Sequence, residues 1–152
     1  MPNPDLQLFK YQTEAKLWAC GRRGEGGTVI IQDGKLSAEI ELAPTSFDLL
    51  ILLIEAAQRV RKEDEEWAPT GFLSAKELQR EMTKQAGGTM NKRRADPEHV
   101  TKAIHRLRKG IGVGLFARRG WRSYAMRLLE KTRLGYRIST EPSNLHLVFL
   151  GA

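Results

Sequence analysis

The most constraining stretch of the sequence is an almost entirely apolar segment, SFDLLILLIEAA, at residues 46–57. A helix that is apolar on nearly every side must be enclosed by the rest of the chain. Its longest apolar run, LLILLI, is far too short to cross a bilayer. We therefore predict a central core helix, capped by Thr45 or Ser46, with Asp48 near the positive end of the helix dipole.

Short runs of β type fill the first 43 residues: LQLFKYQ, AKLWACG, GTVIIQ and KLSAEIEL. Turn signals separate these runs, and apolar residues alternate most clearly in the last one. Asp33-Gly34 suits a hairpin turn, because glycine tolerates a positive φ, and GRRGEGG at residues 21–27 suits a wider turn. The sequence predicts an antiparallel sheet of about four strands, built mostly from neighbours in the chain.

Two further helices are expected after the core helix. Ser74 and Glu77 have the spacing of a capping box at the start of SAKELQREM. At the next helix Asp96 suits the cap, and Pro97 fits the first helical position, where no N–H is needed. Apolar residues then recur with helical period along one side: Val100, Ala103, Ile104, Leu107 and Ile111. This third helix should bury that side against the core.

Positive charge is concentrated in one third of the chain. Residues 91–137 carry 14 Lys/Arg and 3 Asp/Glu, a net charge of +11, whereas the remaining residues carry 11 Lys/Arg and 15 Asp/Glu, a net charge of −4. In a protein whose charges serve only solubility, Lys and Arg are mixed with Asp and Glu along the sequence. A block of one sign instead produces a positive electrostatic field that suits a polyanionic partner. This pattern favours a nucleic-acid partner over a merely solvated basic face.

The cations of the third helix lie opposite its apolar side. That side carries Lys102, His105, Arg106 and Lys109, with Arg108 beside them. Three further arginines, Arg118, Arg119 and Arg122, follow in a segment that fits a loop, a short helix or a strand. Trp121 and Tyr124 in this segment are suited to stacking on bases, but anchoring of the segment onto the domain is favoured.

The C-terminal part again has the character of strands. RLLEKTRLGYRIST and NLHLVFL predict strands with a turn near Leu134-Gly135. We expect one domain over residues 1–152. Its parts are the sheet at 1–43, a three-helix core at 44–112, a basic insertion at 113–127, and a wing hairpin with a C-terminal strand at 128–152.

Four segments occur in an order that indicates a family: LAPTSFDLLILLIEAAQRV, GFLSAKEL, VTKAIHRLRKGIG and LLEKTRLGYRIS. Together they resemble the DNA-binding domain of OmpR/PhoB-type response regulators over residues 17–139. The resemblance implies an α+β fold. It is a winged helix-turn-helix with an N-terminal antiparallel β-sheet, a three-helix core and a C-terminal β-hairpin wing.

The resemblance also implies roles for individual residues. Helix 97–110 would lie in the major groove, with Arg106 on a guanine edge or a phosphate and Arg108 and Lys109 at the backbone. The wing near 131–137 would contact the minor groove or phosphates, through Arg133 above all. The predicted DNA-binding residues are Lys102, His105, Arg106, Arg108, Lys109, Lys131, Arg133, Arg137, Arg118, Arg119 and Arg122.

The sequence also departs from the family. The wing segment KTRLGYR is shorter than usual, and the segments before the third helix and before the wing are longer. In the family the first of these loops contacts RNA polymerase, but GGTMNKRRA has no residue-level match for that role. No receiver domain precedes the sheet, so phosphorylation-driven dimerisation is not expected.

Catalysis is not predicted. His99, His105 and His146 do not have a metal-ligand spacing with the single Cys20, which is expected to be a small buried hydrophobe. The acidic run EDEE at residues 63–66 is expected to be a solvated loop, and no phosphate-binding loop occurs. We expect no enzyme, no metal and no cofactor.

The favoured function is sequence-specific binding of double-stranded DNA by a transcriptional regulator in the cytoplasm, associated with the nucleoid. Without a receiver, specific control would need self-association on tandem sites or a regulatory partner. One alternative is a winged-helix module that recruits RNA polymerase or a larger assembly through an acidic protein. Another is a nonspecific architectural protein that binds nucleic acid. No membrane association is expected, and the N-terminus lacks a signal-peptide pattern, which favours an intracellular setting.

Overall fold

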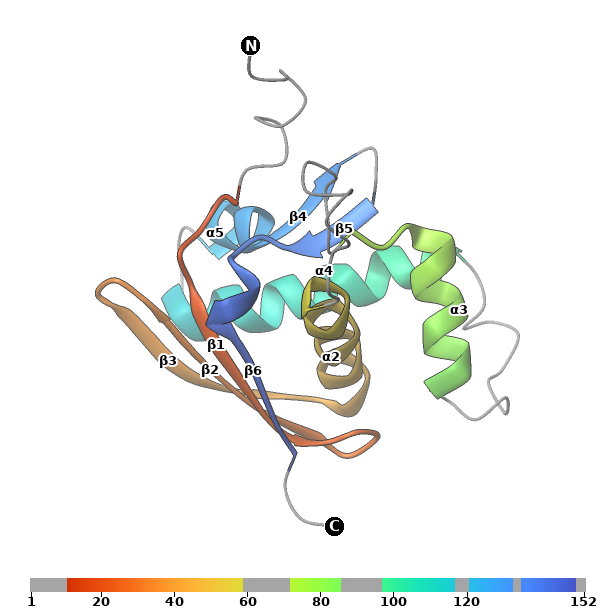
Figure 1. Cartoon of the computed structure of the whole chain (residues 1–152), viewed down its shortest axis with the longest axis horizontal. Coiled ribbons are helices and arrows are strands. Elements are labelled where there is room, and N and C mark those ends of the chain that lie inside the picture. Colours follow the sequence, from red (N-terminus) through yellow and green to blue (C-terminus); the bar gives the residue numbers. More distant parts are fainter. Residues whose placement is uncertain (1–10, 59–71, 86–96, 117–120, 133–134, 150–152) are drawn as a thin grey trace.

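The computed structural model describes residues 11–58, 72–85, 97–116, 121–132 and 135–149 (Figure 1). These residues form an α+β structure with a mixed four-stranded sheet, a two-stranded hairpin and several helices. The elements in chain order are β1 (Lys16–Arg22), β2 (Gly26–Asp33), β3 (Leu36–Leu42), α2 (Pro44–Gln58), α3 (Ala75–Gln85), α4 (Pro97–Phe116), α5 (Trp121–Leu128), β4 (Leu129–Thr132), β5 (Gly135–Ile138), the short 3-10 helix η3 (Pro142–Asn144) and β6 (Leu145–Phe149).

The four-stranded sheet has the order β3-β2-β1-β6. The pairs β1–β2 and β2–β3 are antiparallel, as predicted, and Gly34 has a φ of 59° in the hairpin turn between β2 and β3. The turn predicted over residues 21–27 is narrower than expected, because Gly21 pairs with Gly27 and Arg22 with Gly26.

The prediction that the fourth strand is also antiparallel and N-terminal is wrong. That strand is β6, from the C-terminal end, and it pairs parallel with β1. Leu145 stands opposite Leu17 in this pairing, and both side chains are buried. Residues 11–15 of the chain form no strand, since Thr13 donates its N–H to the Ser139 carbonyl at 3.1 Å instead. Residues 6–10 lie outside the described residues.

Helix α2 is the centre of the core, as predicted from its composition. All its apolar side chains are buried between the sheet, α3 and α4: Phe47, Leu49, Leu50, Ile51, Leu52, Leu53, Ile54, Ala56 and Ala57. The predicted cap is wrong, because the helix already begins at Pro44 and its first bond runs from the Phe47 N–H to the Ala43 carbonyl at 2.9 Å. Asp48 instead accepts the Gly24 N–H at 2.9 Å and holds the β1–β2 turn.

Helix α3 begins with the predicted capping box. The Glu77 N–H donates to Ser74 Oγ at 3.1 Å, and the Ser74 N–H donates to Glu77 Oε1 at 3.2 Å. The two contacts satisfy backbone donors that a helix start leaves open.

Helix α4 is longer than predicted. It does not end near residue 110 but continues through GIGVG to Phe116. A Cβ atom on Gly114 would lie 2.5 Å from Ile40 Cγ1, so only glycine allows the helix to approach β3 this closely. This close packing offsets the helix propensity lost at Gly114, about 1 kcal/mol. Residues 113–116, assigned above to an insertion, are therefore part of α4.

The segment whose sequence fitted a loop, a short helix or a strand includes the helix α5 at residues 121–128. Tyr124 is buried on α5, which confirms its expected anchoring role. The predicted hairpin is present as β4 and β5, paired from Leu129–Ile138 to Thr132–Gly135. A single bridge between Leu73 and Tyr136 joins the hairpin to the start of α3.

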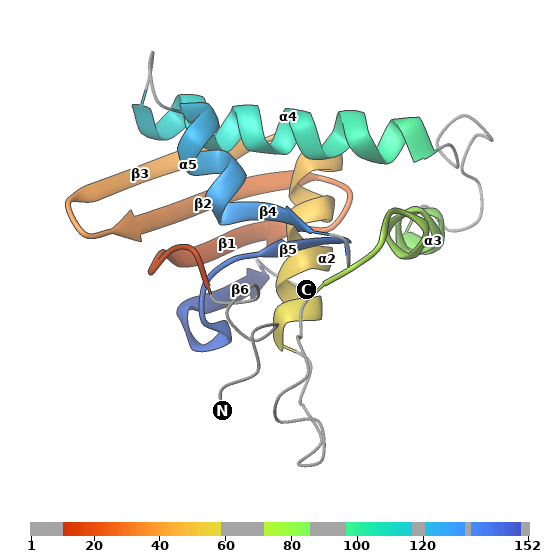
Figure 2. The ribbon, with the colours of Figure 1, turned by 90° about the horizontal axis from the view of Figure 1, so that it is seen from above.

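Figure 2 shows how these elements divide the molecule. Helix α4 runs along one side, next to β3, and β6 lies on the other side, with α2 between them. In the described part of the chain, no helix has the length and apolar character needed to cross a membrane.

Candidate nucleic-acid interface

A stripe of cationic side chains follows the outer face of α4. Lys102, Arg106 and Lys109 are exposed at successive turns, and His105 is exposed next to them. The opposite face of the same helix is buried against α2, α3 and β3, as the apolar period predicted. Since no other described element lies outside α4 in Figure 2, the stripe faces outward along one side of the molecule.

Val113 extends this stripe by one turn and was not among the predicted residues. Its spacing from Lys102, Arg106 and Lys109 continues the same helical row, and its side chain is 39% exposed. The predicted helix ended near residue 110 and therefore did not include Val113. The signal that could have found Val113 is the spacing of 102, 106, 109 and 113, which is that of one helix face.

The predicted role of Arg108 is corrected by the structure. Its guanidinium is half-buried and donates from Nε and Nη2 to the Leu129 carbonyl at 3.0 and 2.5 Å. Burial lowers the pKa of Arg108, and the opposing effect of Tyr136 is smaller. Arg108 lies on the flank of α4 next to β4, because its side chain is turned by about 100° from that of the adjacent Lys109. It fastens the hairpin to the helix and does not join the outer stripe.

Arg137 is also internal, contrary to the prediction. Its side chain is 2% exposed and forms an ion pair with the buried Glu130 of the neighbouring strand. The guanidinium lies between two aromatic rings, 4.6 Å from the Tyr11 centroid and 4.5 Å from the Phe72 centroid. Because Arg137 points from β5 toward these rings, it joins the N-terminal segment to the hairpin.

Lys131 is the hairpin cation that the structure places at the surface. Its Nζ lies 5.5 Å from the centroid of the Tyr136 ring, and the Arg108 guanidinium lies 5.9 Å from the same centroid. Tyr136 therefore brings the exposed hairpin cation next to the flank of α4. This flank is not the face of α4 that carries Lys102, Arg106 and Lys109.

The other predicted residues are not placed. Arg118, Arg119 and Arg133 lie outside the described residues, as does the side chain of Arg122, whose backbone belongs to α5.

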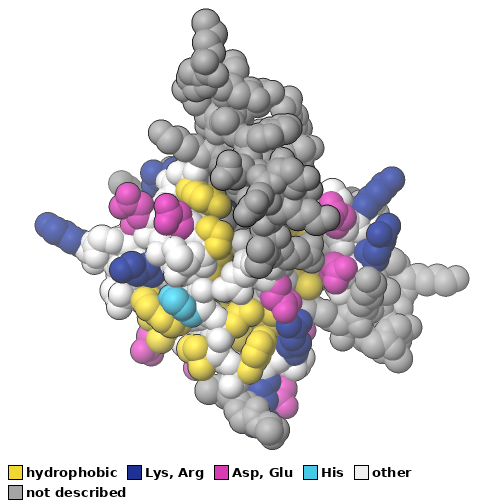
Figure 3. Space-filling model, viewed as in Figure 1, with side chains coloured by type: hydrophobic (Ala, Val, Ile, Leu, Met, Phe, Trp, Pro, Cys, Tyr) yellow, Lys and Arg dark blue, Asp and Glu magenta, His cyan; other side chains and the backbone are white. Residues whose placement is uncertain are grey.

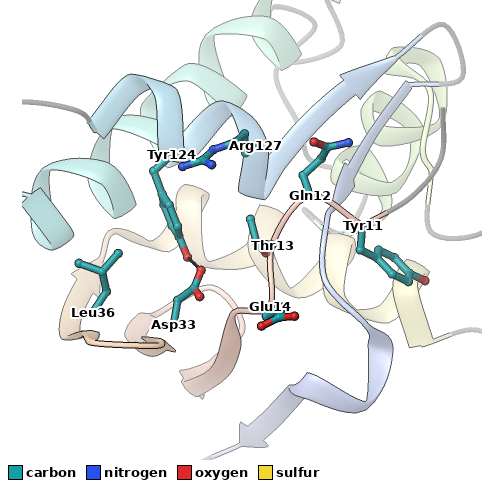
Figure 4. A pocket seen from close by; sticks show the side chains of 8 residues that line it. All are labelled: Tyr11, Gln12, Thr13, Glu14, Asp33, Leu36, Tyr124 and Arg127. Carbon is teal, nitrogen blue, oxygen red and sulfur yellow. Dashed lines mark hydrogen bonds between the residues drawn. The ribbon is translucent and has the colours of Figure 1, made fainter. Parts of the chain in front are cut away.

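A hollow of about 560 Å³ lies elsewhere, between the N-terminal segment, the β2–β3 hairpin and α5 (Figure 4). The Tyr124 hydroxyl donates to Asp33 Oδ2 at 2.6 Å, and the Arg127 guanidinium lies 5.7 Å from the Tyr124 ring. Burial raises the pKa of Tyr124, and the hydrogen bond to Asp33 raises it further. The phenol therefore stays protonated and holds α5 on the hairpin.

Cys20 is half-buried in β1. Among the residues that the structure describes, no three His, Cys, Asp or Glu side chains are grouped so that they could hold a metal ion. No family model, curated protein or solved structure matches the chain.

Proposed function

We propose that this chain is a winged helix-turn-helix protein that binds double-stranded DNA in a sequence-specific manner and regulates transcription at the nucleoid. In this proposal α3 and α4 are the helix-turn-helix, α4 is the recognition helix, and the β4–β5 hairpin is the wing. The observation that carries it is the outer face of α4, where Lys102, Arg106 and Lys109 are exposed in one row above a fully buried apolar face.

The dimensions support this function. A helix with its side chains is about 10–12 Å wide, and the major groove is about 12 Å wide. The row from Lys102 to Val113 spans about 16 Å along the axis, a length that a straight helix can present to the groove. Lys131 next to the same helix suits a phosphate or minor-groove contact by the wing.

Salt dependence of binding to duplex DNA tests the proposal. If about six phosphates are neutralised, affinity should fall by roughly three decades between about 50 and 200 mM salt. The variant Lys102→Ala/Arg106→Ala/Lys109→Ala should bind more weakly and reduce the slope of log K against log salt by about 2.7.

Lys35→Ala is the matched control. Lys35 is an exposed cation in the β2–β3 turn, which Figure 2 shows at the other end of the molecule from the start of α4. It should leave both affinity and slope unchanged apart from a small general charge effect. Equal losses in the two variants would remove α4 from the interface, and a wild-type protein without duplex affinity would overturn the proposed function.

Selection from a random duplex pool tests specificity separately. One enriched motif supports a regulator, whereas salt-dependent binding without enrichment would favour a nonspecific architectural protein. Binding to an acidic protein without affinity for DNA would favour the protein-recruitment alternative.

A further inference from the structure

The two edges of the four-stranded sheet differ in charge. β3 forms one edge and exposes Glu39 and Glu41. β6 forms the other edge with the sequence LHLVF, which contains no Lys, Arg, Asp or Glu. Charged side chains on an edge strand discourage pairing with another strand, and β6 has none. Leu145 is already bonded, because its N–H donates to the Pro142 carbonyl and its carbonyl accepts from Gln58 Nε2 at 2.8 Å, so a further strand would pair with the part of β6 after Leu145. Within the described residues, β1 is the only strand paired with β6.

The uncharged edge also exposes large apolar side chains. Val148 is 40% exposed and Phe149 is 50% exposed. The Arg23 guanidinium lies 5.5 Å from the centroid of the Phe149 ring and is paired with Glu55 at 2.7 Å, so this cation beside the edge is neutralised. Val148 shares the face of the sheet with His146, whose ring stacks on Trp18 with centroids 5.3 Å apart. Figure 3 shows hydrophobic side chains gathered over the part of the surface where β1 and β6 lie. A strand edge of this kind is suited to burial against a further strand.

We propose that β6 pairs antiparallel with β6 of a second copy of this chain, so that two sheets join into one. The strand is complementary to itself, because an antiparallel pair of these uncharged strands places no like charges opposite each other. Pairing of β6 with β3 of another copy is disfavoured by Glu39 and Glu41 and by α4, which packs along β3. The symmetric contact also closes on itself and stops at two copies.

Such a pair would hold two separate DNA duplexes, an inference that rests on the proposed function. The order β3-β2-β1-β6 puts the β6 edge opposite the edge next to which α4 lies (Figure 2). A twofold axis at β6 therefore turns the two cationic stripes away from each other. Two helices that face in opposite directions cannot enter the groove of one straight duplex, so each copy binds its own.

Sedimentation velocity of the full chain without DNA tests the contact itself. The wild-type protein should show a reversible, concentration-dependent dimer in the micromolar range. Val148→Lys places a charge on the exposed edge and should raise the dimer dissociation constant by roughly tenfold or more. Ser37→Lys, an exposed position on β3, is the matched control and should dimerise like the wild type. A monomeric wild type, or equal weakening by both variants, overturns the β6 contact.

Capture of a second duplex tests the divalent arrangement. One duplex is immobilised, a second carries a fluorescent label, and protein is added at a concentration that saturates a single duplex. The wild type and Ser37→Lys should capture the labelled duplex, and Val148→Lys should bind the immobilised duplex equally well but capture much less of the labelled duplex. Dimers that capture no second duplex would show that both stripes contact one duplex and overturn the bridging.

The two proposals fail in different ways. If the wild type binds no single duplex, the proposed function and the bridging both fall, and sedimentation alone decides the β6 contact. If single-duplex binding is normal and Val148→Lys captures as much of the second duplex as the wild type, only the inference about β6 falls.

Discussion

The outer face of α4 exposes its cationic side chains, whereas the β4–β5 hairpin buries one. Arg106 lies exposed in a row with Lys102 and Lys109, whereas Arg137, from the same basic third of the sequence, is buried between Tyr11 and Phe72. Arg108, two positions after Arg106, is already half-buried against β4. A block of positive charge therefore does not by itself identify the residues of an interface.

The direction in which each side chain points decides whether it is exposed or buried. Each step along a helix turns the side chain by about 100°, so two steps leave Arg106 and Arg108 pointing in directions about 160° apart. On a strand, adjacent side chains alternate between faces, so Arg137 points away from the face of its neighbour Tyr136. Exposed cations suit phosphate and base contacts, and buried ones suit the joining of elements.

The largest expected effect belongs to Arg137. Arg137→Ala leaves the Glu130 carboxylate buried without its partner, which should reduce the free energy of unfolding by about 3–5 kcal/mol. Urea denaturation measures this loss. Protein that remains folded should keep the wild-type affinity for duplex DNA, since the side chain is 2% exposed.

The double variant Arg137→Met/Glu130→Leu is the control for this prediction. It replaces the ion pair with apolar side chains and should recover most of the lost stability. If Arg137→Ala instead kept its stability and lost DNA affinity, Arg137 would belong to the interface after all.

A smaller effect is expected for Arg108. Arg108→Ala removes the donors to the Leu129 carbonyl and should reduce the free energy of unfolding by about 1.5–3 kcal/mol. Because Arg108 neutralises no phosphate in the proposed complex, the salt slope of DNA binding should stay as in the wild type. Arg106→Ala should do the reverse, with unchanged stability and a slope lower by about 0.9. A slope change in Arg108→Ala would contradict its assignment as a positioning residue.

Local signals in the sequence predicted much of the fold. The capping box of Ser74 and Glu77 needs only residues of one helix turn, and it is present. The buried face of α4 and the strands β1, β2 and β3 follow from apolar period, which is also local. These features were predictable because each depends on neighbours in the chain.

The features that were missed depend on contacts between distant residues. Helix α4 continues past Gly110 because Gly114 packs on Ile40, a contact across nearly half of the chain. β6 joins the sheet because Leu145 fits next to Leu17. The burial of Arg137 requires Tyr11 and Phe72, which no helical or strand period connects with it. Periodicity can assign a face to a side chain, but it cannot say which element covers that face.

The smallest expected effect concerns Val113, at the uncharged end of the α4 row. In the proposed complex Val113 is suited to an apolar contact with a thymine methyl group. Val113→Ala should weaken binding to the selected site by about fivefold, or about 1 kcal/mol, without a change in the salt slope. Replacing the contacted thymine by uracil, which lacks the methyl group, should weaken wild-type binding by a similar factor and leave Val113→Ala unaffected. Additive losses from the two changes would mean that Val113 and the methyl group do not meet, and the row that contacts bases would then end at Lys109.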